Sequence, residues 1–223
     1  MQGFKLTGYL TKAYSPSIDG AVHLDSLITK ALCVAENIPP VPENTMEIID
    51  IPVFRIWEDQ EGKPLWATTN LIPIEGEPVF KSMEYWHKRF PERRIIDYCK
   101  KPNTATRRGR YKEYRIPVQV QFCRGVEAYG IGDIERISEL IQHVTHIGKK
   151  WAQGKGRVVW EIEEWGGDEV KIENICMGRT IPLEFYQKKD KSKMLGKRRV
   201  MTRGAWTPPY WYRPWFSPCV TFK

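Results

Sequence analysis

Residues 133–165 read DIERISELIQHVTHIGKKWAQGKGRVVWEIEEW, and this stretch decides the predicted fold. Its first half predicts a helix over 133–148, because apolar residues recur at helical spacing along one face. Those residues are Ile134, Ile137, Leu140, Ile141, Val144 and Ile147. Asp133 is a favourable N-cap, and Gly148 is typical of the end of a helix. RVVWEIEEW (157–165) then alternates apolar and polar side chains, so it is predicted to be a strand.

Elements of the same two kinds precede this stretch. We predict a strand over 4–10, a helix over 21–32, and further strands over 46–57, 64–72 and 114–123. The order strand, helix, strand, strand, helix, strand is the βαββαβ pattern of a ferredoxin-like α+β fold, whose two helices cover one face of the sheet. RNA-recognition-motif (RRM) domains share this order, but the chain lacks their aromatic strand motif. We expect one domain over residues 1–223.

The bulk composition is that of a folded protein without a membrane anchor. No stretch approaches the roughly 20 apolar residues of a membrane span, and the first residues lack the pattern of a signal peptide. The cysteines are odd in number and form no C-x-x-C pair, so neither a disulfide framework nor a zinc site is predicted. His143 and His146 lie three apart, but no suitably spaced carboxylate or cysteine completes a metal site. We expect a cytoplasmic protein without a cofactor.

Positive charge is segregated along the chain. The net charge is +8, yet residues 1–80 hold 5 Lys/Arg against 11 Asp/Glu. Residues 81–115 hold 12 Lys/Arg against 4 Asp/Glu, and residues 186–223 hold 10 against the single Asp190. Blocks of one sign with aromatic residues among them favour a polyanionic partner over a merely solvated surface.

The segment IGKKWAQGKG (147–156) resembles a phosphate-binding P-loop only at first sight. Five residues separate Gly148 from Gly154 where a P-loop has four, and Gly156 stands where the magnesium-binding hydroxyl is needed. The segment also follows a helix and precedes a strand, the reverse of a P-loop or a dinucleotide fingerprint. Its glycines, cations and tryptophan favour contact with an RNA backbone over an ordinary exposed turn. The candidate RNA-binding residues here are Gly148, Lys149, Lys150, Trp151, Gln153, Gly154, Lys155, Gly156 and Arg157.

The basic block 81–115 has the same character. RRGRYK (107–112) can follow a nucleic-acid backbone, and Tyr111 can stack on a base. We interpret the block as a β-hairpin arm that reaches away from the core; a disordered basic loop is the alternative. Its candidate RNA-binding residues are Arg107, Arg108, Arg110, Tyr111 and Lys112.

Two further features are left with open alternatives. His23, at the start of the helix predicted over 21–32, is included among the RNA-binding candidates, and a structural or capping role is its alternative. Residues 186–223 show no clear periodicity and are predicted to be irregular, basic and aromatic. Their WTPPYWYRPWF stretch (206–216) is either a partner-binding surface or a cover for the domain's own sheet.

These segments together resemble the RAMP proteins of CRISPR systems. IGKKWAQGKGRVVWEIEE (147–164) looks like the glycine-rich loop that lies between the second helix and the last strand of that family. HLDSLITKAL (23–32) resembles the first helix of the RAMP subunit of type IV effectors. The basic insertion 81–115 resembles the thumb hairpin of the Cas-five family. The resemblance covers most of residues 1–165.

The resemblance implies a non-catalytic, RNA-binding subunit of a type IV effector. Its implied partners are the five-prime handle of the crRNA, a backbone RAMP subunit and the large subunit of the complex; contact with target DNA near the PAM is left open. Some family members cleave precursor guide RNA with Tyr, Lys and His side chains. Type IV systems usually carry a separate processing protein, so no enzymatic activity is expected.

Two alternatives of other classes stay open. A metal-independent endoribonuclease would need a general base such as His23, His87 or a tyrosine to activate a ribose hydroxyl. A free-standing RNA-binding module would need no partner subunits. Cleavage of repeat RNA in EDTA distinguishes the first from the effector subunit, and the size of the native assembly distinguishes the second.

Overall fold

The computed structural model describes residues 1–16, 21–38, 48–88, 114–148, 154–189, 198–208, 210 and 215–222. Within these residues the chain is a mixed α+β structure with antiparallel sheets. The largest sheet has the strand order β4-β7-β1-β8. Its strands are β1 (Gln2–Leu10), β4 (Ile72–Pro73), β7 (Gly125–Gly132) and β8 (Val158–Glu164). β1 lies at the centre and pairs antiparallel with both β7 and β8, as Leu6 does with Ala128 and Ile162.

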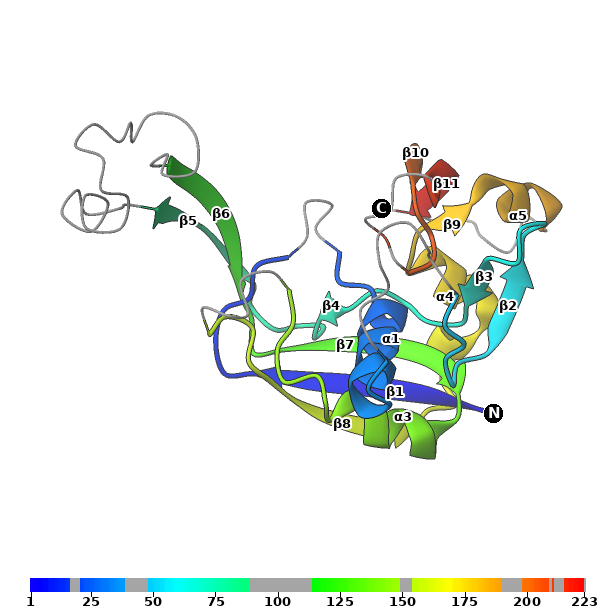
Figure 1. Ribbon diagram of the computed structural model, residues 1–223, viewed down its shortest axis with the longest axis horizontal. Helices are drawn as coiled ribbons and strands as arrows, with labels where there is room; N and C mark the ends of the chain where they lie inside the picture. The colour runs from blue at the N-terminus through cyan, green and yellow to red at the C-terminus, as the bar shows by residue number, and fades with distance from the viewer. Residues whose placement is uncertain are drawn as a thin grey trace, which may run out of the picture.

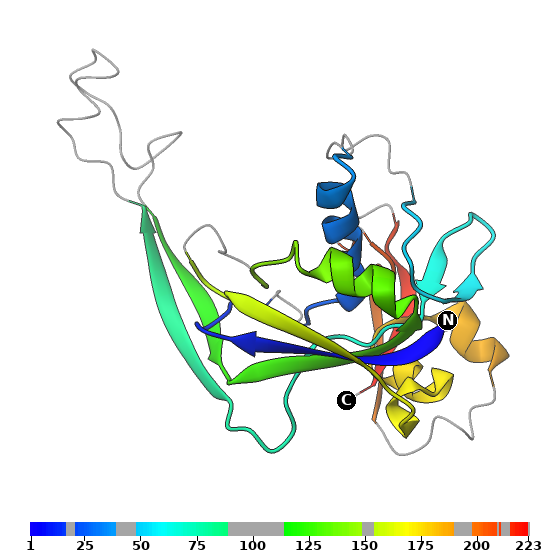
Figure 2. The ribbon, with the colours of Figure 1, turned by 90° about the horizontal axis from the view of Figure 1, so that it is seen from below.

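Two helices, α1 (Leu24–Ala35) and α3 (Ile134–Ile141), lie on the same face of this sheet (Figure 2). Side chains from both helices and three strands form one buried cluster because every second strand residue faces the helices. Its central members include Phe4, Leu6, Leu24, Ile28, Val126, Ala128, Ile137, Leu140, Val158 and Trp160. The predicted N-cap is confirmed, since the Asp133 carboxylate accepts a hydrogen bond from the backbone N–H of Arg136 at 3.1 Å.

The second helix is shorter than the predicted range of 133–148. α3 ends at Ile141, and the chain then runs beside the start of β8, where Val158 N–H donates to the carbonyl of Thr145 at 3.1 Å. Val144 and Ile147 are buried as expected, but from this irregular segment. Positions three apart can be buried by either conformation, so apolar spacing did not locate the helix end. His146 therefore lies outside the helix, and its backbone forms an isolated antiparallel β-bridge with Arg157.

A long two-stranded ribbon stands out from the body (Figure 1). β5 (Phe80–Lys88) pairs antiparallel with β6 (Tyr114–Phe122), from the Phe80–Phe122 pair to the Lys88–Tyr114 pair. The predicted hairpin arm is thus confirmed for its stem, while residues 89–113 lie outside the described residues. The strand predicted over 114–123 belongs to this ribbon and not to the central sheet.

The other two central strands also differ from prediction. β2 (Arg55–Glu58) and β3 (Pro64–Trp66) form a separate two-stranded hairpin, and only the two-residue β4 joins the main sheet. Both predicted strands, 46–57 and 64–72, were too long. Residues 67–71 connect the β2–β3 hairpin to the main sheet, and there Thr69 N–H donates to the Tyr129 carbonyl at 2.8 Å.

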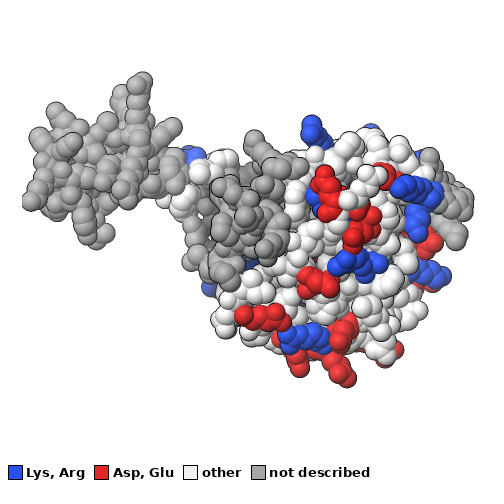
Figure 3. Space-filling model, turned by 45° about the vertical axis from the view of Figure 1, so that its right-hand side comes forward, with Lys and Arg blue, Asp and Glu red and all other residues white. Residues whose placement is uncertain are grey.

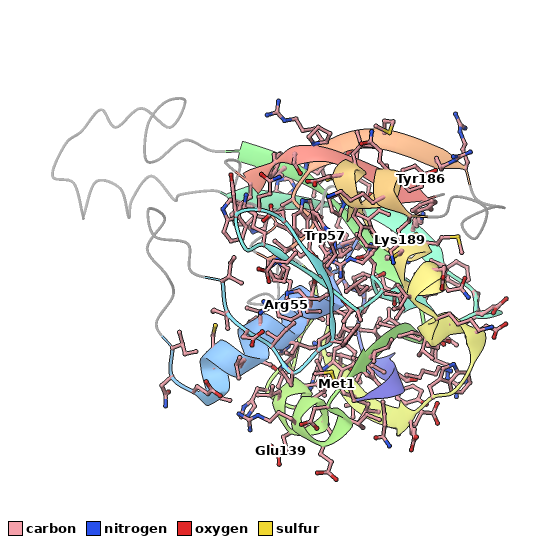
Figure 4. The ribbon with its side chains drawn as sticks, turned by 90° about the vertical axis from the view of Figure 1, so that its right-hand side faces the viewer. Met1, Arg55, Trp57, Glu139, Tyr186 and Lys189 are labelled. Carbon is pink, nitrogen blue, oxygen red and sulfur yellow. The ribbon has the colours of Figure 1, made fainter. Side chains whose placement is uncertain are left out.

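The C-terminal third builds a second layer with its own buried cluster. It contains η3 (Asp168–Val170), α4 (Ile172–Met177), β9 (Ile181–Pro182), α5 (Leu183–Lys188), β10 (Arg199–Gly204) and β11 (Ser217–Phe222). The last two strands join β9 in a sheet of order β10-β11-β9, so the prediction of an irregular chain over 186–223 is wrong there. Trp57 of the β2–β3 hairpin packs against this layer, with its ring centroid 5.6 Å from that of Trp206 and 5.9 Å from that of Phe185 (Figure 4). None of the helices in the described ranges is long and apolar enough to span a membrane.

Candidate nucleic-acid interface

The glycine-rich loop is shaped by contacts within the protein. Gly148 and Gly156 have φ angles of +74° and +68°, a region that side-chain-bearing residues rarely adopt. A Cβ atom would lie 2.3 Å from the Ser15 carbonyl oxygen at Gly148, and 2.1 Å from the Ile147 carbonyl oxygen at Gly156. Gly156 N–H already donates to the Ala13 carbonyl at 2.8 Å. These two glycines therefore let the loop pack against residues 13–15, so the predicted purpose of close approach to an anion is not needed to explain them.

Two exposed cations lie at this loop. Arg157 is exposed at the start of β8, and its carbonyl accepts a hydrogen bond from Thr11 N–H at 3.1 Å. Lys12 is also exposed, and its ammonium lies 3.6 Å from the position that a Cβ of Gly154 would take. Neither cation has an ion-pair partner among the described residues. Lys149, Lys150, Trp151 and Gln153 lie outside those residues, as do Arg107, Arg108, Arg110, Tyr111 and Lys112.

Lys12 was missed by the sequence-based reasoning, although the order of the strands held the signal. β1 and β8 run antiparallel, with Leu10 paired to Val158. The residues that follow β1 must therefore lie beside the residues that precede β8. A cation two positions after the first strand belongs to the same surface as the glycine-rich loop.

Lys155 has a different environment from its neighbours. Its Nζ atom donates to Oε2 of Glu84, on β5, at 2.5 Å, and the Lys155 side chain is only 22% exposed. The loop is thereby joined to the ribbon. A second contact at the same place joins Tyr14 and Gln121 of β6, which exchange backbone hydrogen bonds of 3.0 and 2.8 Å. Burial raises the pKa of Tyr14 well above its ordinary value, with a smaller contribution from Cys123, so its phenol keeps its proton.

The outer face of the main sheet has the wrong charge for RNA. Paired residues of antiparallel strands share a face, so Lys5 and Thr7 of β1 lie beside Glu163 and Glu161 of β8 on the side away from the helices. Lys5 Nζ is also 3.4 Å from a carboxylate oxygen of Glu127. Figure 3 shows acidic and basic side chains interspersed on the described part of the body that it views. The exposed cations Lys12 and Arg157 thus lie at the end of the sheet and not on the face that RRM domains use.

His23 lies in an interior network. Its ring stacks on that of Tyr210, with centroids 3.7 Å apart and planes 9° from parallel, and its Nδ1 atom is 2.8 Å from Oδ1 of Asn70. It occupies the N-cap position of α1 without a side-chain capping bond. These contacts favour the structural alternative for His23.

The same network contains a buried ion pair that sequence reasoning missed. Arg179 donates to Asp25 Oδ2 at 2.8 Å, and the two side chains are 2% and 1% exposed. The guanidinium also donates to the carbonyls of Trp66 and Trp206, each at 2.7 Å. Tyr210 O–H donates to Asp25 at 2.7 Å. One arginine thus holds the first turn of α1, the end of β3 and the C-terminal layer together. The one available signal was Asp25 itself, a carboxylate on the apolar face of a predicted helix.

The electrostatics of Arg179 keep it charged. Burial acts to lower the pKa of this guanidinium, but the neighbouring Tyr210 and Asp25 raise it to a value above the ordinary one. Its Nε atom is buried and has no hydrogen-bond partner among the described residues. In those residues no group of three or more His, Cys, Asp or Glu side chains is placed to hold a metal ion.

Comparison with known families identifies the class of protein. Residues 81–220 match the model of the family described as CRISPR type IV associated protein Csf3. No curated relative matches the chain. The matched range includes the glycine-rich loop, the ribbon except its first residue, and the C-terminal layer except the last two residues of β11.

The chain is thus a CRISPR-associated component of a type IV complex. It belongs to the Csf3 family, the Cas5-like subunits of these complexes.

Proposed function

We propose that this chain is a non-catalytic subunit that binds the five-prime handle of the crRNA in a type IV effector. The proposal rests on three segments that contact one another. They are the β5–β6 ribbon, the glycine-rich loop and the turn after β1. Lys12 and Arg157 are exposed cations at this junction. Phosphate groups of an RNA chain would find positive charge, an exposed turn and a projecting ribbon in one place.

The arrangement of strands and helices supports the same role. We propose that residues 1–223 form one RAMP domain with a ferredoxin-like core, in which the ribbon β5–β6 is the thumb. The sheet order β4-β7-β1-β8, with α1 and α3 on one face, is compatible with a βαββαβ core whose second strand is reduced to β4. The thumb would then meet a neighbouring backbone subunit, and the exposed side chains Phe80, Met83 and Tyr85 suit a protein contact.

The test is a salt titration of handle binding. Binding of a labelled repeat-derived RNA would be measured by fluorescence anisotropy for the wild-type chain and for Lys12→Ala plus Arg157→Ala. Each phosphate contact with single-stranded RNA contributes about 0.7 to the slope of log K against log salt. The double variant should flatten the slope by about 1.4 and weaken binding. Lys171→Ala is the control, because this exposed lysine pairs with Asp168 and follows Val170, which lies beside Gly3 at the opposite end of β1. An unchanged slope in the double variant would reject the interface.

The role as one subunit of an effector, with a backbone subunit and a large subunit as partners, has its own test. Protein purified from its native source should elute from a sizing column with other subunits and a short RNA of defined length. Elution as a free monomer would favour the free-standing RNA module. Crosslinking to target DNA near the PAM, once the complex is in hand, would decide that contact.

One feature of the ribbon favours the endoribonuclease as the second candidate. His87 lies opposite Arg115 in the β5–β6 register, and the Arg115 guanidinium lies 3.8 Å from the ring centroid of Tyr85. A base beside a cation is suited to activating a ribose hydroxyl next to a phosphate. Incubation of the chain with repeat RNA in EDTA should give no products if the subunit is non-catalytic. Discrete fragments ending in 2′,3′-cyclic phosphate, lost in His87→Ala, would establish the enzyme.

A further inference from the structure

The contact between Lys155 and Glu84 separates this lysine from the other cations of the junction. Its ammonium is 2.5 Å from the Glu84 carboxylate, whereas Lys12 and Arg157 have no acidic partner among the described residues. A phosphate approaching Lys155 must displace Glu84 or meet a charge that is already compensated. A phosphate approaching Lys12 or Arg157 displaces no acidic side chain of the described residues. The three cations are therefore unequal as phosphate ligands.

The position of Glu84 shows what the ion pair does instead. The ribbon projects from the body (Figure 1), and each of its strands makes a polar contact with the body: β6 near its base, at Gln121, and β5 at mid-strand, at Glu84. β6 is held by the paired backbone hydrogen bonds between Gln121 and Tyr14, and β5 by the ion pair between Glu84 and Lys155. Both contacts reach the same part of the body. Lys155 is next to Gly156, whose N–H donates to the Ala13 carbonyl, and Ala13 is next to Tyr14.

Two anchors on two strands fix a direction that one anchor cannot. The Gln121–Tyr14 contact holds β6 alone, and the Glu84–Lys155 ion pair adds a point of contact on β5. Val120, which neighbours Gln121, is fully buried, so the root of the ribbon is packed as well as hydrogen-bonded on that side. The β5 side depends on Glu84, which lies opposite Val118 in the register.

We propose that Lys155 is a positioning residue which, through Glu84, sets the direction of the thumb ribbon, while Lys12 and Arg157 bind the phosphates. This inference rests on the proposed function for its RNA part. It changes the role expected for one of the candidate RNA-binding residues, and it assigns roles to Lys12 and Glu84. The loop and the thumb then bind RNA as one unit, because moving one moves the other.

Hydrogen exchange in the free full-length protein tests the positioning role without RNA. Lys155→Met and Glu84→Gln should each accelerate amide exchange in β5 and β6 near the ribbon root by about two- to fivefold, the range expected for a partly exposed ion pair. The double variant should be no faster than either single variant, because both changes break the same contact. Unchanged exchange in both single variants, or fully additive effects, would overturn the positioning role.

The salt slope of RNA binding tests the division of labour. Lys12→Ala and Arg157→Ala should each flatten the slope by about 0.7. Lys155→Met should weaken binding about two- to fivefold and leave the slope unchanged, because no phosphate contact is lost. The charge-swapped chain, with Lys155→Glu and Glu84→Lys, should recover most of the affinity. Flattening of the slope by about 0.7 in Lys155→Met, or no recovery in the swapped chain, would overturn the proposal. Failure of the wild-type chain to bind RNA at all would instead reject the proposed function, and the exchange experiment would still decide the role of Lys155.

Discussion

The guanidinium of Arg179 and the carboxylate of Asp25 meet 2.8 Å apart in the interior, with almost no exposed surface on either side chain. They come from the C-terminal layer and from the first turn of α1. A buried charge left without its partner is strongly destabilising, whereas the intact pair can be nearly neutral relative to apolar packing. The C-terminal layer must therefore pack on α1 in an arrangement that keeps these two side chains paired.

Replacement of Arg179 should therefore be severe. Arg179→Met leaves the Asp25 carboxylate in the interior with hydrogen bonds from Tyr210 and from the Ser26 N–H but without its cation, and should lower the free energy of unfolding by about 3–5 kcal/mol. Urea denaturation followed by circular dichroism measures the change. Arg124→Met is the control, since the Arg124 side chain is 74% exposed, and it should stay within about 0.5 kcal/mol of wild type. A loss below about 1 kcal/mol in Arg179→Met would show that the pair carries little of the layer contact.

The hydroxyl of Tyr210 is predicted to contribute to stability through its contacts with Asp25 and Arg179. Tyr210→Phe keeps the stack on His23 but removes the donor to Asp25 and the acceptor that lies 2.8 Å from Arg179. Loss of a hydrogen bond to a charged group costs about 1.5–3 kcal/mol. Tyr9→Phe, at an exposed tyrosine, should change the stability by less than about 0.5 kcal/mol. Equal stability of the two variants would contradict the role given to the hydroxyl.

Gly156 and Gly76 form a matched pair for the loop. Both have positive φ angles, +68° and +79°, but a Cβ atom would clash with the Ile147 carbonyl at Gly156 and meets nothing within 4 Å at Gly76. Gly76→Ala should cost only the conformational strain, about 1–2 kcal/mol. Gly156→Ala should cost clearly more, because the chain must also move away from the Ile147 carbonyl. Thermal unfolding of both variants gives the comparison, and equal losses would mean that φ alone explains the glycine.

Stability should fall at alkaline pH, in part through Cys176. Burial raises the pKa of this thiol from 9.0 to about 12, although the charge of Arg179 acts to lower it. Between pH 9 and 12 the unfolded chain has lost this proton while the folded chain keeps it. The free energy of unfolding therefore falls as pH rises, by up to about 1.4 kcal/mol per pH unit from this group. The stability is fully present below pH 9.

The comparison with Cys176→Ala isolates that contribution. The variant should be less stable at pH 7, because a buried side chain is shortened, but its decline above pH 9 should be shallower than that of wild type. Tyr14 and Cys123, whose pKa values are also raised by burial, keep part of the decline in both proteins. Parallel pH profiles from denaturant titrations would show that Cys176 does not contribute.

Strong local patterns allowed several elements to be predicted. β1, α1 and β8 have clear periods of two or 3.6 residues. The hairpin predicted for the basic block is right for β5, whereas its partner β6 was predicted as a strand of the central sheet. The predicted helix over 133–148 is right only as far as Ile141, because buried positions of an irregular segment have the same spacing. β4 and β9, with two residues each, are too short to have a period at all.

The candidate site was predictable in its outline and not in its details. Charge and glycine content pointed to the loop at Lys155 and Arg157, yet nothing local distinguishes a lysine paired with Glu84 from one free to bind phosphate. Those partners are 71 residues apart and meet only through the packing of the ribbon root. The predictions for 107–112 and for 149–153 fall outside the described residues and stay predictions.

The long sequence separation of the interior network has a consequence for how the protein is made. Asp25 lies 154 residues before Arg179 and 185 residues before Tyr210. At about 5–20 residues per second, a ribosome needs roughly ten to forty seconds to travel from the first to the last of these codons. Until Arg179 has been synthesised, the Asp25 carboxylate of α1 lacks the cation that accompanies it in the interior, so this part of the core cannot close as in the folded chain. The interior network therefore closes only after the C-terminal layer has been synthesised, and a chain that stops before Arg179 leaves the Asp25 carboxylate without its cation.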